Sequence, residues 1–277
     1  MKIKITYMSG AGNLFTVIDN TSNILSSEQG KSLAPILCSV NEKNKFETEG
    51  LMLLEQSADY NFKCVFFNPD GSTGMMCGNG GRAIVKFALN KGVIKSNQDK
   101  VLFEMAGAVY SAEILDELID LEMPNIRDYK VQTLKLQGRL VNTHYVDNGS
   151  QHTVIRIDKI DLLDISKLDI NGIGREVRYN EAFGSIGSNA NFYDVKGKIV
   201  YLRTYERGVE KETGACGTGA VATAITAVEE SGLNFPVDII PTSGEKITID
   251  KRIDVKKGTK FHLIGPAIIL KEMEIEV

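Results

Sequence analysis

Two short segments of the chain carry a cysteine that is followed by Gly-x-Gly and then by an apolar stretch. They are CGNGGRAIVKFALNKG at 77–92 and CGTGAVATAITAVEESG at 216–232. A cysteine at a helix start lies beside unpaired N–H groups and the positive end of the helix dipole, which both stabilise a thiolate. We therefore expect the pKa of Cys77 to lie below the ordinary value of about 8.5. The glycines let a small carboxylate approach the backbone N–H groups.

Two such cysteines suggest proton transfer at the α-carbon of a bound amino acid. One thiolate could remove the α-proton while the other thiol delivers a proton to the opposite face. The N–H groups of the two helix starts would stabilise the negative charge that develops on the carboxylate. The pattern favours a racemase or epimerase without a cofactor. Buried structural thiols, a nucleophilic cysteine and a redox pair with Cα atoms within about 7 Å are the alternatives.

The same elements surround both cysteines. A strand is expected before each, at 61–67 and at 198–205, and a polar loop that contains glycine follows each strand. The helices after the cysteines are expected to end at Gly92 and Gly232. This repeat suggests an ancient duplication with two similar α/β halves, and the pattern changes near 121–129.

The other elements are mostly short runs in which apolar and polar residues alternate, which favours antiparallel sheets. One further helix is expected within 23–40. The remaining strands are expected at 14–20, 51–56, 100–106, 108–115, 152–158, 245–250 and 266–277.

The composition is that of an ordinary globular protein with 277 residues, of which 43% are hydrophobic and 25% charged. The net charge of −4 argues against nucleic acid or a membrane surface as partner. No apolar run approaches the roughly 18 residues of a membrane helix, and the start lacks a signal-peptide core, so we expect a cytoplasmic protein. The spacing of the cysteines and histidines predicts no metal site, and Cys38 and Cys64 are interpreted as small buried hydrophobes.

The segments NPDGSTGMMCGNGGRA and ERGVEKETGACGTGAVA resemble the two signature segments of the diaminopimelate epimerase family. Four further segments resemble other parts of that family, so the resemblance spans the chain. They are YMSGAGNLFTVID, VDNGSQHTVIRID, GSNANFYDV and HLIGPAIIL. Members interconvert LL- and meso-diaminopimelate in lysine and peptidoglycan biosynthesis with two cysteines and no pyridoxal phosphate. The resemblance therefore implies an isomerase without a cofactor.

The resemblance also implies a role for each matching residue. The two acid/base thiols would be Cys77 and Cys216. The residues that offer backbone N–H groups to the reacting carboxylate would be Gly78, Asn79, Gly217 and Thr218. The remaining pocket residues would be Asn13 near the reacting centre, Asn68, Asn189 and Arg207 at the far end of the substrate, and Glu206 at an ammonium group. Ser150 replaces an asparagine that contacts the distal end, and His152 has either a structural or a direct role.

The fold implied by the resemblance is α+β, with two halves related by a pseudo-twofold axis. Each half would be a curved, mostly antiparallel sheet around a central helix, and the active site would lie in the cleft between them. The expected halves are 1–123 with 264–277, and 124–263. The helical stretches RAIVKFAL and AVATAITAV are apolar nearly all round, which fits burial inside such sheets.

Several positions depart from the family pattern. Ser9 and Leu14 stand where the family has His and Asp, and Gly149-Ser150-Gln151-His152 stands where it has Gly-Asn-Pro-His. A racemase or epimerase of proline, hydroxyproline or histidine is therefore an alternative, as is a non-catalytic binding or redox-sensing protein. The expected partner is a small amino-acid substrate, and a homodimer is the assembly that we consider.

Overall fold

The computed structural model describes residues 2–41, 46–73, 78–254 and 258–276. The chain divides into two compact units. The first unit is Met1–Glu122 with Ile264–Val277, and the second unit is Met123–Leu263. The division between Glu122 and Met123 lies beside the boundary expected after residue 123. Cys77 lies outside the described residues, and so does the end of the loop that precedes it.

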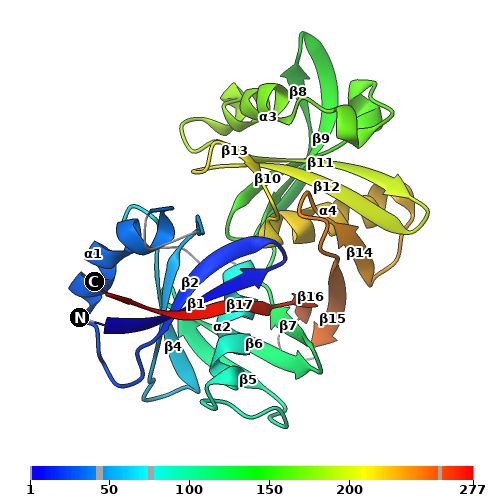
Figure 1. Ribbon diagram of the computed structural model, residues 1–277. Helices are drawn as coiled ribbons and strands as arrows, with labels where there is room; N and C mark the ends of the chain where they lie inside the picture. Colours follow the sequence, from blue (N-terminus) through cyan, green and yellow to red (C-terminus); the bar gives the residue numbers. More distant parts are fainter. Residues whose placement is uncertain (1, 42–45, 74–77, 255–257, 277) are drawn as a thin grey trace. The chain divides into compact units, whose positions relative to one another are not determined.

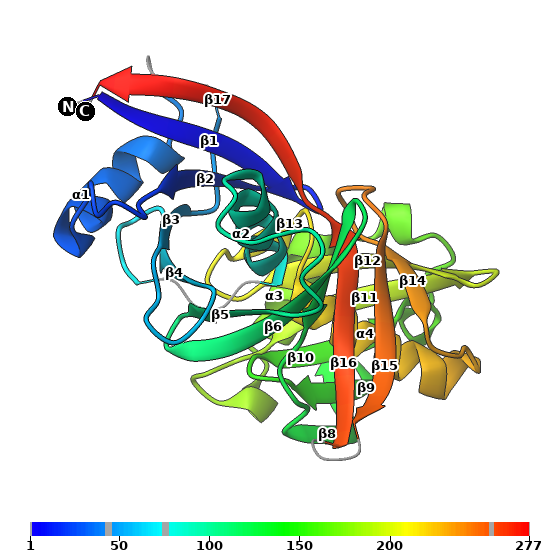
Figure 2. The ribbon, with the colours of Figure 1, turned by 90° about the horizontal axis from the view of Figure 1, so that it is seen from below.

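The first unit is a mostly antiparallel sheet with two helices (Figure 1). Its elements are β1 (Lys2–Gly10), β2 (Asn13–Asp19), α1 (Ser27–Cys38), β3 (Leu51–Glu55), β4 (Phe62–Phe67), α2 (Gly78–Asn90), β5 (Val101–Met105), β6 (Ala108–Leu115), β7 (Leu118–Glu122) and β17 (Ile268–Glu276). The last strand returns to the first: β17 lies antiparallel beside β1, with Lys2 opposite Glu276 (Figure 2). Strands β2 and β3, and β4 and β5, pair in parallel, and the other neighbours are antiparallel.

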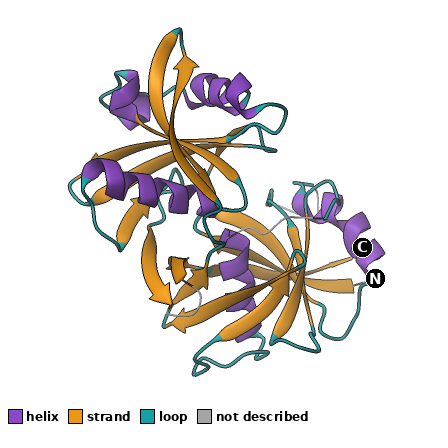
Figure 3. Ribbon diagram, turned by 180° about the vertical axis from the view of Figure 1, so that it is seen from behind, coloured by secondary structure: helices purple, strands orange, loops and turns teal. Residues whose placement is uncertain are grey.

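The second unit is likewise a mostly antiparallel sheet with helices (Figure 3). Its strands are β8 (Asp128–Leu136), β9 (Arg139–Asp147), β10 (Gln151–Arg156), β11 (Asn189–Lys196), β12 (Ile199–Glu206), β13 (Lys211–Thr213), β14 (Val237–Ile240) and β15 (Ile247–Asp254). Its helices are α3 (Ile170–Arg178), α4 (Gly217–Ser231) and the short 3-10 turns Ile157–Ile160, Ile165–Lys167 and Glu181–Phe183. The chain passes from this unit into the first along β16 (Gly258–Pro266).

The two units repeat one order of elements and pairings. In the first unit β2 and β3 pair in parallel, β3 and β4 antiparallel, and β4 and β5 in parallel, with α1 and α2 in the two parallel crossovers. In the second unit β10, β11, β12 and β14 pair in the same order, with α3 and α4 in the corresponding crossovers. The expected α+β class with two similar halves is therefore confirmed at the level of topology.

Each cysteine-associated helix is enclosed by the sheet of its own unit. Helix α2 packs against β1, β2, β3, β7 and β17, and α4 packs against β9 to β12, β14 and β15. Both helices are buried over most of their length, as their apolar composition predicts. Helix α4 ends where expected, because Gly232 adopts the left-handed conformation (φ 65°) that a helix C-terminus favours.

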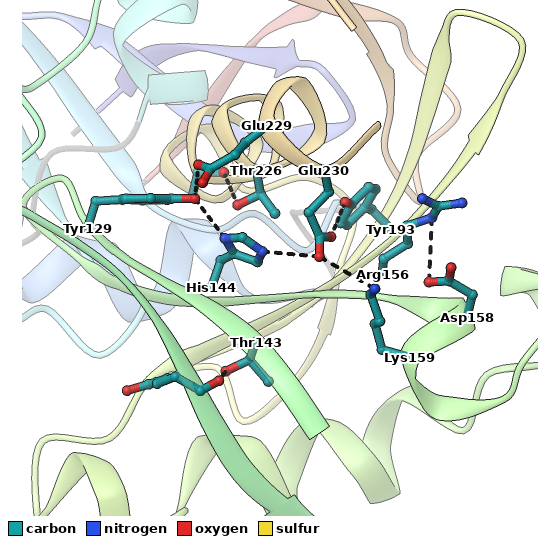
Figure 4. Close-up of polar contacts among 12 residues, drawn as sticks. Tyr129, Thr143, His144, Arg156, Asp158, Lys159, Tyr193, Thr226, Glu229 and Glu230 are labelled. Atoms are coloured by element: carbon teal, nitrogen blue, oxygen red, sulfur yellow. Dashed lines mark hydrogen bonds and ion pairs between the residues drawn. The ribbon is translucent and has the colours of Figure 1, made fainter. Parts of the chain in front are cut away.

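A polar cluster fixes the C-terminal end of α4 to the sheet of the second unit (Figure 4). The carboxylate of Glu230 accepts a hydrogen bond from the Tyr193 hydroxyl at 2.7 Å and lies 3.1 Å from His144 Nε2. His144 Nδ1 lies 2.7 Å from the Tyr129 hydroxyl, which donates to Glu229. The helix that follows Cys216 is thus held at the end remote from the cysteine.

Helix α3 was not expected from the sequence. Two glycines lower its helix propensity, but Asp169 caps its start by accepting a hydrogen bond from Gly172 N–H at 3.0 Å. Its apolar face, which includes Val177, is buried against β11 and β12. A Cβ at Gly174 would overlap the side chain of Tyr205, with only 2.5 Å between the two Cβ atoms. Glycine at this position therefore permits the close packing that stabilises the helix. Among the described residues, none of the helices has the length and apolar character needed to cross a bilayer.

Candidate functional site

The described site residues fall into two groups, one in each unit. The first unit holds Asn13, Asn68, Gly78 and Asn79, and the second holds Ser150, His152, Asn189, Glu206, Arg207, Cys216, Gly217 and Thr218. No group of three His, Cys, Asp or Glu side chains in the described part of the chain is arranged to hold a metal ion.

Cys216 is the N-cap residue of α4 and has an extended backbone (φ −121°, ψ 111°). Its side chain is nearly buried, at 7% exposure, and Sγ lies 3.6 Å from the Thr218 hydroxyl. The glycine at 219 is required here, because a Cβ would overlap Asn191 Oδ1 and lie 3.3 Å from the Cys216 sulfur. The Cys-Gly-x-Gly pattern therefore lets α4 start against β11 with the thiol beside it.

The first turn of α4 has the features of a carboxylate site. The N–H groups of Gly217 and Thr218 belong to a helix start, where the helix itself supplies no carbonyl partner. No acidic side chain occupies this turn, so the positive end of the helix dipole is not neutralised within it. Asn148, in the turn after β9, donates to the Thr218 carbonyl at 2.9 Å and holds the turn against the helix. An incoming carboxylate would thus meet a fixed set of donors.

A second polar group gathers around Asn189, the first residue of β11. Asn189 Nδ2 donates to Ser150 Oγ at 2.9 Å and to the Gln151 carbonyl at 2.8 Å, and its Oδ1 accepts from Arg207 N–H at 2.8 Å. The Arg207 guanidinium donates to Gln151 Oε1 at 2.8 Å. Three of the predicted distal-end residues are therefore brought together, and Gln151 joins them without having been predicted.

Glu206 ends β12, immediately before Arg207. Its carboxylate accepts a hydrogen bond from the Thr213 hydroxyl at 2.9 Å. Burial raises the pKa of Glu206, although the hydrogen bond from Thr213 opposes this. No ion pair engages the Glu206 carboxylate in the part of the chain that the structure describes. It is therefore a suitable acceptor for a ligand ammonium group, which would offset the desolvation of the charge.

His152 is fully buried in β10. Its Nδ1 accepts a hydrogen bond from Asn191 Nδ2 at 3.1 Å, because an amide nitrogen can only donate, and its proton therefore lies on Nε2. Burial, followed by the charge of Arg207, lowers the pKa of His152 to about 3. Within the described part of the chain, Nε2 has no hydrogen-bond partner. His152 is thus a neutral imidazole whose buried Nε2–H donor is not hydrogen-bonded by any residue that the structure describes.

Asn191 was missed by the sequence analysis. Its amide links three strands of the second unit, since Nδ2 also donates to the Thr153 carbonyl at 3.2 Å and Oδ1 accepts from the Thr204 hydroxyl at 3.1 Å. Asn189 and Asn191 alternate in the sequence SNANF and so point to the same face of β11. That alternation of asparagines in a strand was the signal available.

In the first unit, α2 begins with Gly78 and Asn79. Asn79 is fully buried, and its Oδ1 accepts a hydrogen bond from Arg82 Nη2 at 2.9 Å. A Cβ at Gly10 would overlap the carbonyl oxygen of Asn79, so glycine lets the end of β1 touch the first turn of α2. Gly78 and Asn79, which are predicted to offer backbone N–H groups to the carboxylate, therefore form the start of α2, directly after Cys77 in the sequence.

Asn13 lies directly after the β1–β2 turn, in which Ala11 and Gly12 have positive φ. The side chain is buried, and Nδ2 donates to a Glu49 carboxylate oxygen. Asn13 Oδ1 is buried and has no hydrogen-bond partner among the residues that the structure describes. It is therefore an acceptor that a ligand can use.

Asn68 lies in the loop after β4. Its Nδ2 donates to the Ser72 hydroxyl at 2.8 Å, and its N–H donates to the Ser72 carbonyl at 2.9 Å. These bonds shape the loop that leads toward Cys77 and leave Asn68 half-buried. They do not connect Asn68 with Asn13 or Asn79.

The other cysteines match their interpretation as structural residues. Cys38 and Cys64 are buried and form no disulfide. Burial raises the pKa of Cys38 to about 11 and raises that of Cys64 further. Neither thiol is therefore ionised at neutral pH, as a reactive thiol must be.

Comparison with known proteins matches this chain to one family along most of its length. The profile of the family described as "Diaminopimelate epimerase" matches residues 5–123 and 144–269. The diaminopimelate epimerase of Flavobacterium psychrophilum is 33% identical over 275 residues, which cover 99% of this chain and 100% of that protein. The diaminopimelate epimerase of Aquifex aeolicus is 36% identical over 265 residues and 90% of each chain.

The fold has also been observed in solved structures with little sequence similarity. A phenazine biosynthesis protein of the PhzF family from Bacillus anthracis superposes with a TM-score of 0.74. The alignment covers 100% of both chains at 11% identity, a level that shows a shared fold alone.

Proposed function

This chain belongs to the diaminopimelate epimerase family, and from that premise we propose that it interconverts LL- and meso-diaminopimelate without a cofactor. Cys216 and Cys77 are the two groups that exchange protons with the α-carbon. The substrate is a free amino acid, and we place the reaction in the cytoplasm, where thiols stay reduced.

The observation that carries this proposal is one continuous polar frame within the second unit. Asn148 fixes the start of α4, next to Cys216, to the turn that contains Ser150. Ser150 bonds Asn189, which in turn accepts from the Arg207 backbone. The same frame therefore holds two groups that can each bind a carboxylate, namely the start of α4 and the guanidinium of Arg207. Diaminopimelate carries a carboxylate at each end and matches this pair of sites.

The proton transfer needs one thiolate and one thiol. The thiolate takes the α-proton, so that the Cα–H bond breaks and an S–H bond forms while electron density moves into the substrate carboxylate. The opposite thiol then gives its proton to the other face of the α-carbon and becomes the thiolate. The N–H groups of Gly217 and Thr218, with Gly78 and Asn79, stabilise the charge on the carboxylate. No electron is gained or lost overall.

The far end of the substrate accounts for the other polar residues. Arg207 binds the distal carboxylate, supported by Asn189, Ser150 and Asn68, and Glu206 receives the distal ammonium. In the described part of the chain the Arg207 guanidinium bonds only the neutral side chain of Gln151, so its charge is available for an anion. Proline and hydroxyproline, the substrates of the alternative racemases, have no distal carboxylate that this guanidinium could bind.

The test is proton NMR of the reduced protein in D2O with LL-diaminopimelate, beside L-proline, hydroxyproline and L-histidine in separate samples. We expect the α-proton signal of diaminopimelate alone to disappear as the meso product forms. Exchange confined to another amino acid would keep the two-thiol chemistry and replace the substrate. An absence of exchange in all samples, with both thiols titrating as free, would favour the non-catalytic alternative.

A further inference from the structure

We propose that Gln151 is a positioning residue for Arg207, and that it sets the affinity for the distal carboxylate of the substrate. This inference rests on the proposed function, because it assigns Arg207 to that carboxylate. Gln151 itself need not touch the substrate; it acts through the guanidinium.

The side chain of Gln151 is held at both ends of its amide. Gln151 opens β10 directly opposite Asp147, the last residue of β9. Nε2 donates to Asp147 Oδ2 at 3.3 Å, and Oε1 accepts from Arg207 Nη1 at 2.8 Å. A carboxylate can only accept and a guanidinium can only donate, so the amide has one orientation that satisfies both neighbours. Asp147 is in turn fixed by accepting from Gly149 N–H at 2.9 Å.

Arg207 is thereby held at two points. Its backbone N–H is bound by Asn189 Oδ1 at 2.8 Å, and its guanidinium is bound by Gln151 Oε1. Arg207 follows the end of β12, so without the second bond its long side chain would be free to sample many rotamers. Fixing it before the ligand arrives removes part of the entropy cost of binding.

The neutral amide is what makes this arrangement useful. A carboxylate at the same place would orient the guanidinium equally well but would neutralise it and compete with the substrate. The amide of Gln151 instead lies between the Asp147 carboxylate and the Arg207 guanidinium and separates the two charges. The other N–H donors of the guanidinium are left for a ligand. The segment that Gln151 belongs to resembles a motif with proline at this position, and a proline side chain has no acceptor to offer.

The first experiment is a double-mutant cycle with Gln151→Met and Arg207→Ala, assayed with diaminopimelate. Methionine has a similar length but accepts poorly. We expect Gln151→Met to raise KM about tenfold, the size of a lost hydrogen bond to a charged group, with kcat within about twofold. In the Arg207→Ala background the same change should have no further effect. Additive losses in the two backgrounds, or a fall in kcat at unchanged KM, would overturn the proposal.

Two further variants sharpen the result. Gln151→Glu should raise KM more than Gln151→Met, and the defect should shrink at low pH as the introduced carboxylate is protonated. A KM lower than that of Gln151→Met at neutral pH would contradict the argument from charge. Gln98→Met is the matched control, because Gln98 lies in the first unit outside the predicted site residues, and its side chain donates to the Lys100 carbonyl at 2.9 Å. It should leave KM unchanged.

A substrate-free readout separates this proposal from the proposed function. The Nη1 protons of Arg207 should give a slowly exchanging NMR signal in the wild-type protein, which is lost in Gln151→Met and kept in Gln98→Met. If the wild-type protein does not turn over diaminopimelate but this signal behaves as expected, the function fails and the positioning role stands. A signal that is unchanged in Gln151→Met would refute the positioning role whatever the substrate.

Discussion

His152 gives a prediction about pH whose size follows from the structure. The change is His152→Gln, which removes the titrating ring but keeps an oxygen that can accept from Asn191 Nδ2. In the folded protein the pKa of His152 is lowered to about 3, from an ordinary value of 6.5. Burial is the main cause, since the β10 environment disfavours the imidazolium, and the charge of Arg207 adds to it.

The sign follows from which state binds the proton. Below pH 6.5 the unfolded chain accepts a proton at this position and the folded chain does not, so the free energy of unfolding falls as the pH falls. The loss continues until the pH reaches the folded pKa of about 3. Between pH 8 and pH 5 this single group should remove about 2 kcal/mol from the free energy of unfolding. Between pH 8 and pH 5 the free energy of unfolding of His152→Gln should therefore fall by about 2 kcal/mol less than that of the wild-type protein.

The assay is urea unfolding of both proteins at several pH values, followed through the amide NMR signals of β10 and β11. These signals report the unit that contains His152, which matters because two compact units need not unfold together. Comparing the change with pH, rather than the stability itself, cancels the packing cost of the substitution and the titration of all other groups. Equal losses in the two proteins between pH 8 and pH 5 would refute the reasoning.

Three further predictions concern the thiols, the buried carboxylate and the close packing at α4. Cys216→Ser or Cys77→Ser should lower turnover by about 10²–10⁴ with an unchanged circular dichroism spectrum, because each removes one proton-transfer group; a wild-type rate in either would exclude the two-thiol mechanism. Glu206→Gln should raise KM for diaminopimelate yet raise the Tm of the substrate-free protein at pH 8, because burial raises the pKa of this carboxyl and its ionisation above that pKa costs stability. A lower Tm would contradict this. Gly219→Ala should destabilise the second unit by about 1–3 kcal/mol in urea unfolding, since its Cβ would overlap Asn191 Oδ1, and unchanged stability would show that β11 can yield there.

The sequence by itself determined the local parts of the site. The Cys-Gly-x-Gly pattern and its apolar continuation located the starts of α2 and α4, because helix starts depend on the few residues around them. The expected strands were found within a few residues of their predicted bounds wherever apolar and polar residues alternate, as in β6. The repeated order of strand, loop, cysteine and helix was visible because the same local pattern occurs twice in the sequence.

Tertiary structure decided the features that depend on distant partners. Helix α3 forms because its apolar face packs on β11 and β12, which outweighs the low propensity of its two glycines. Gln151 and Arg207 are 56 residues apart in the chain and meet only because β10, β11 and β12 lie side by side. The neutral state of His152 likewise comes from its burial and its neighbours rather than from its residue type. Local patterns encode where a helix or strand begins, whereas strand pairing and burial decide which side chains meet and how they are charged.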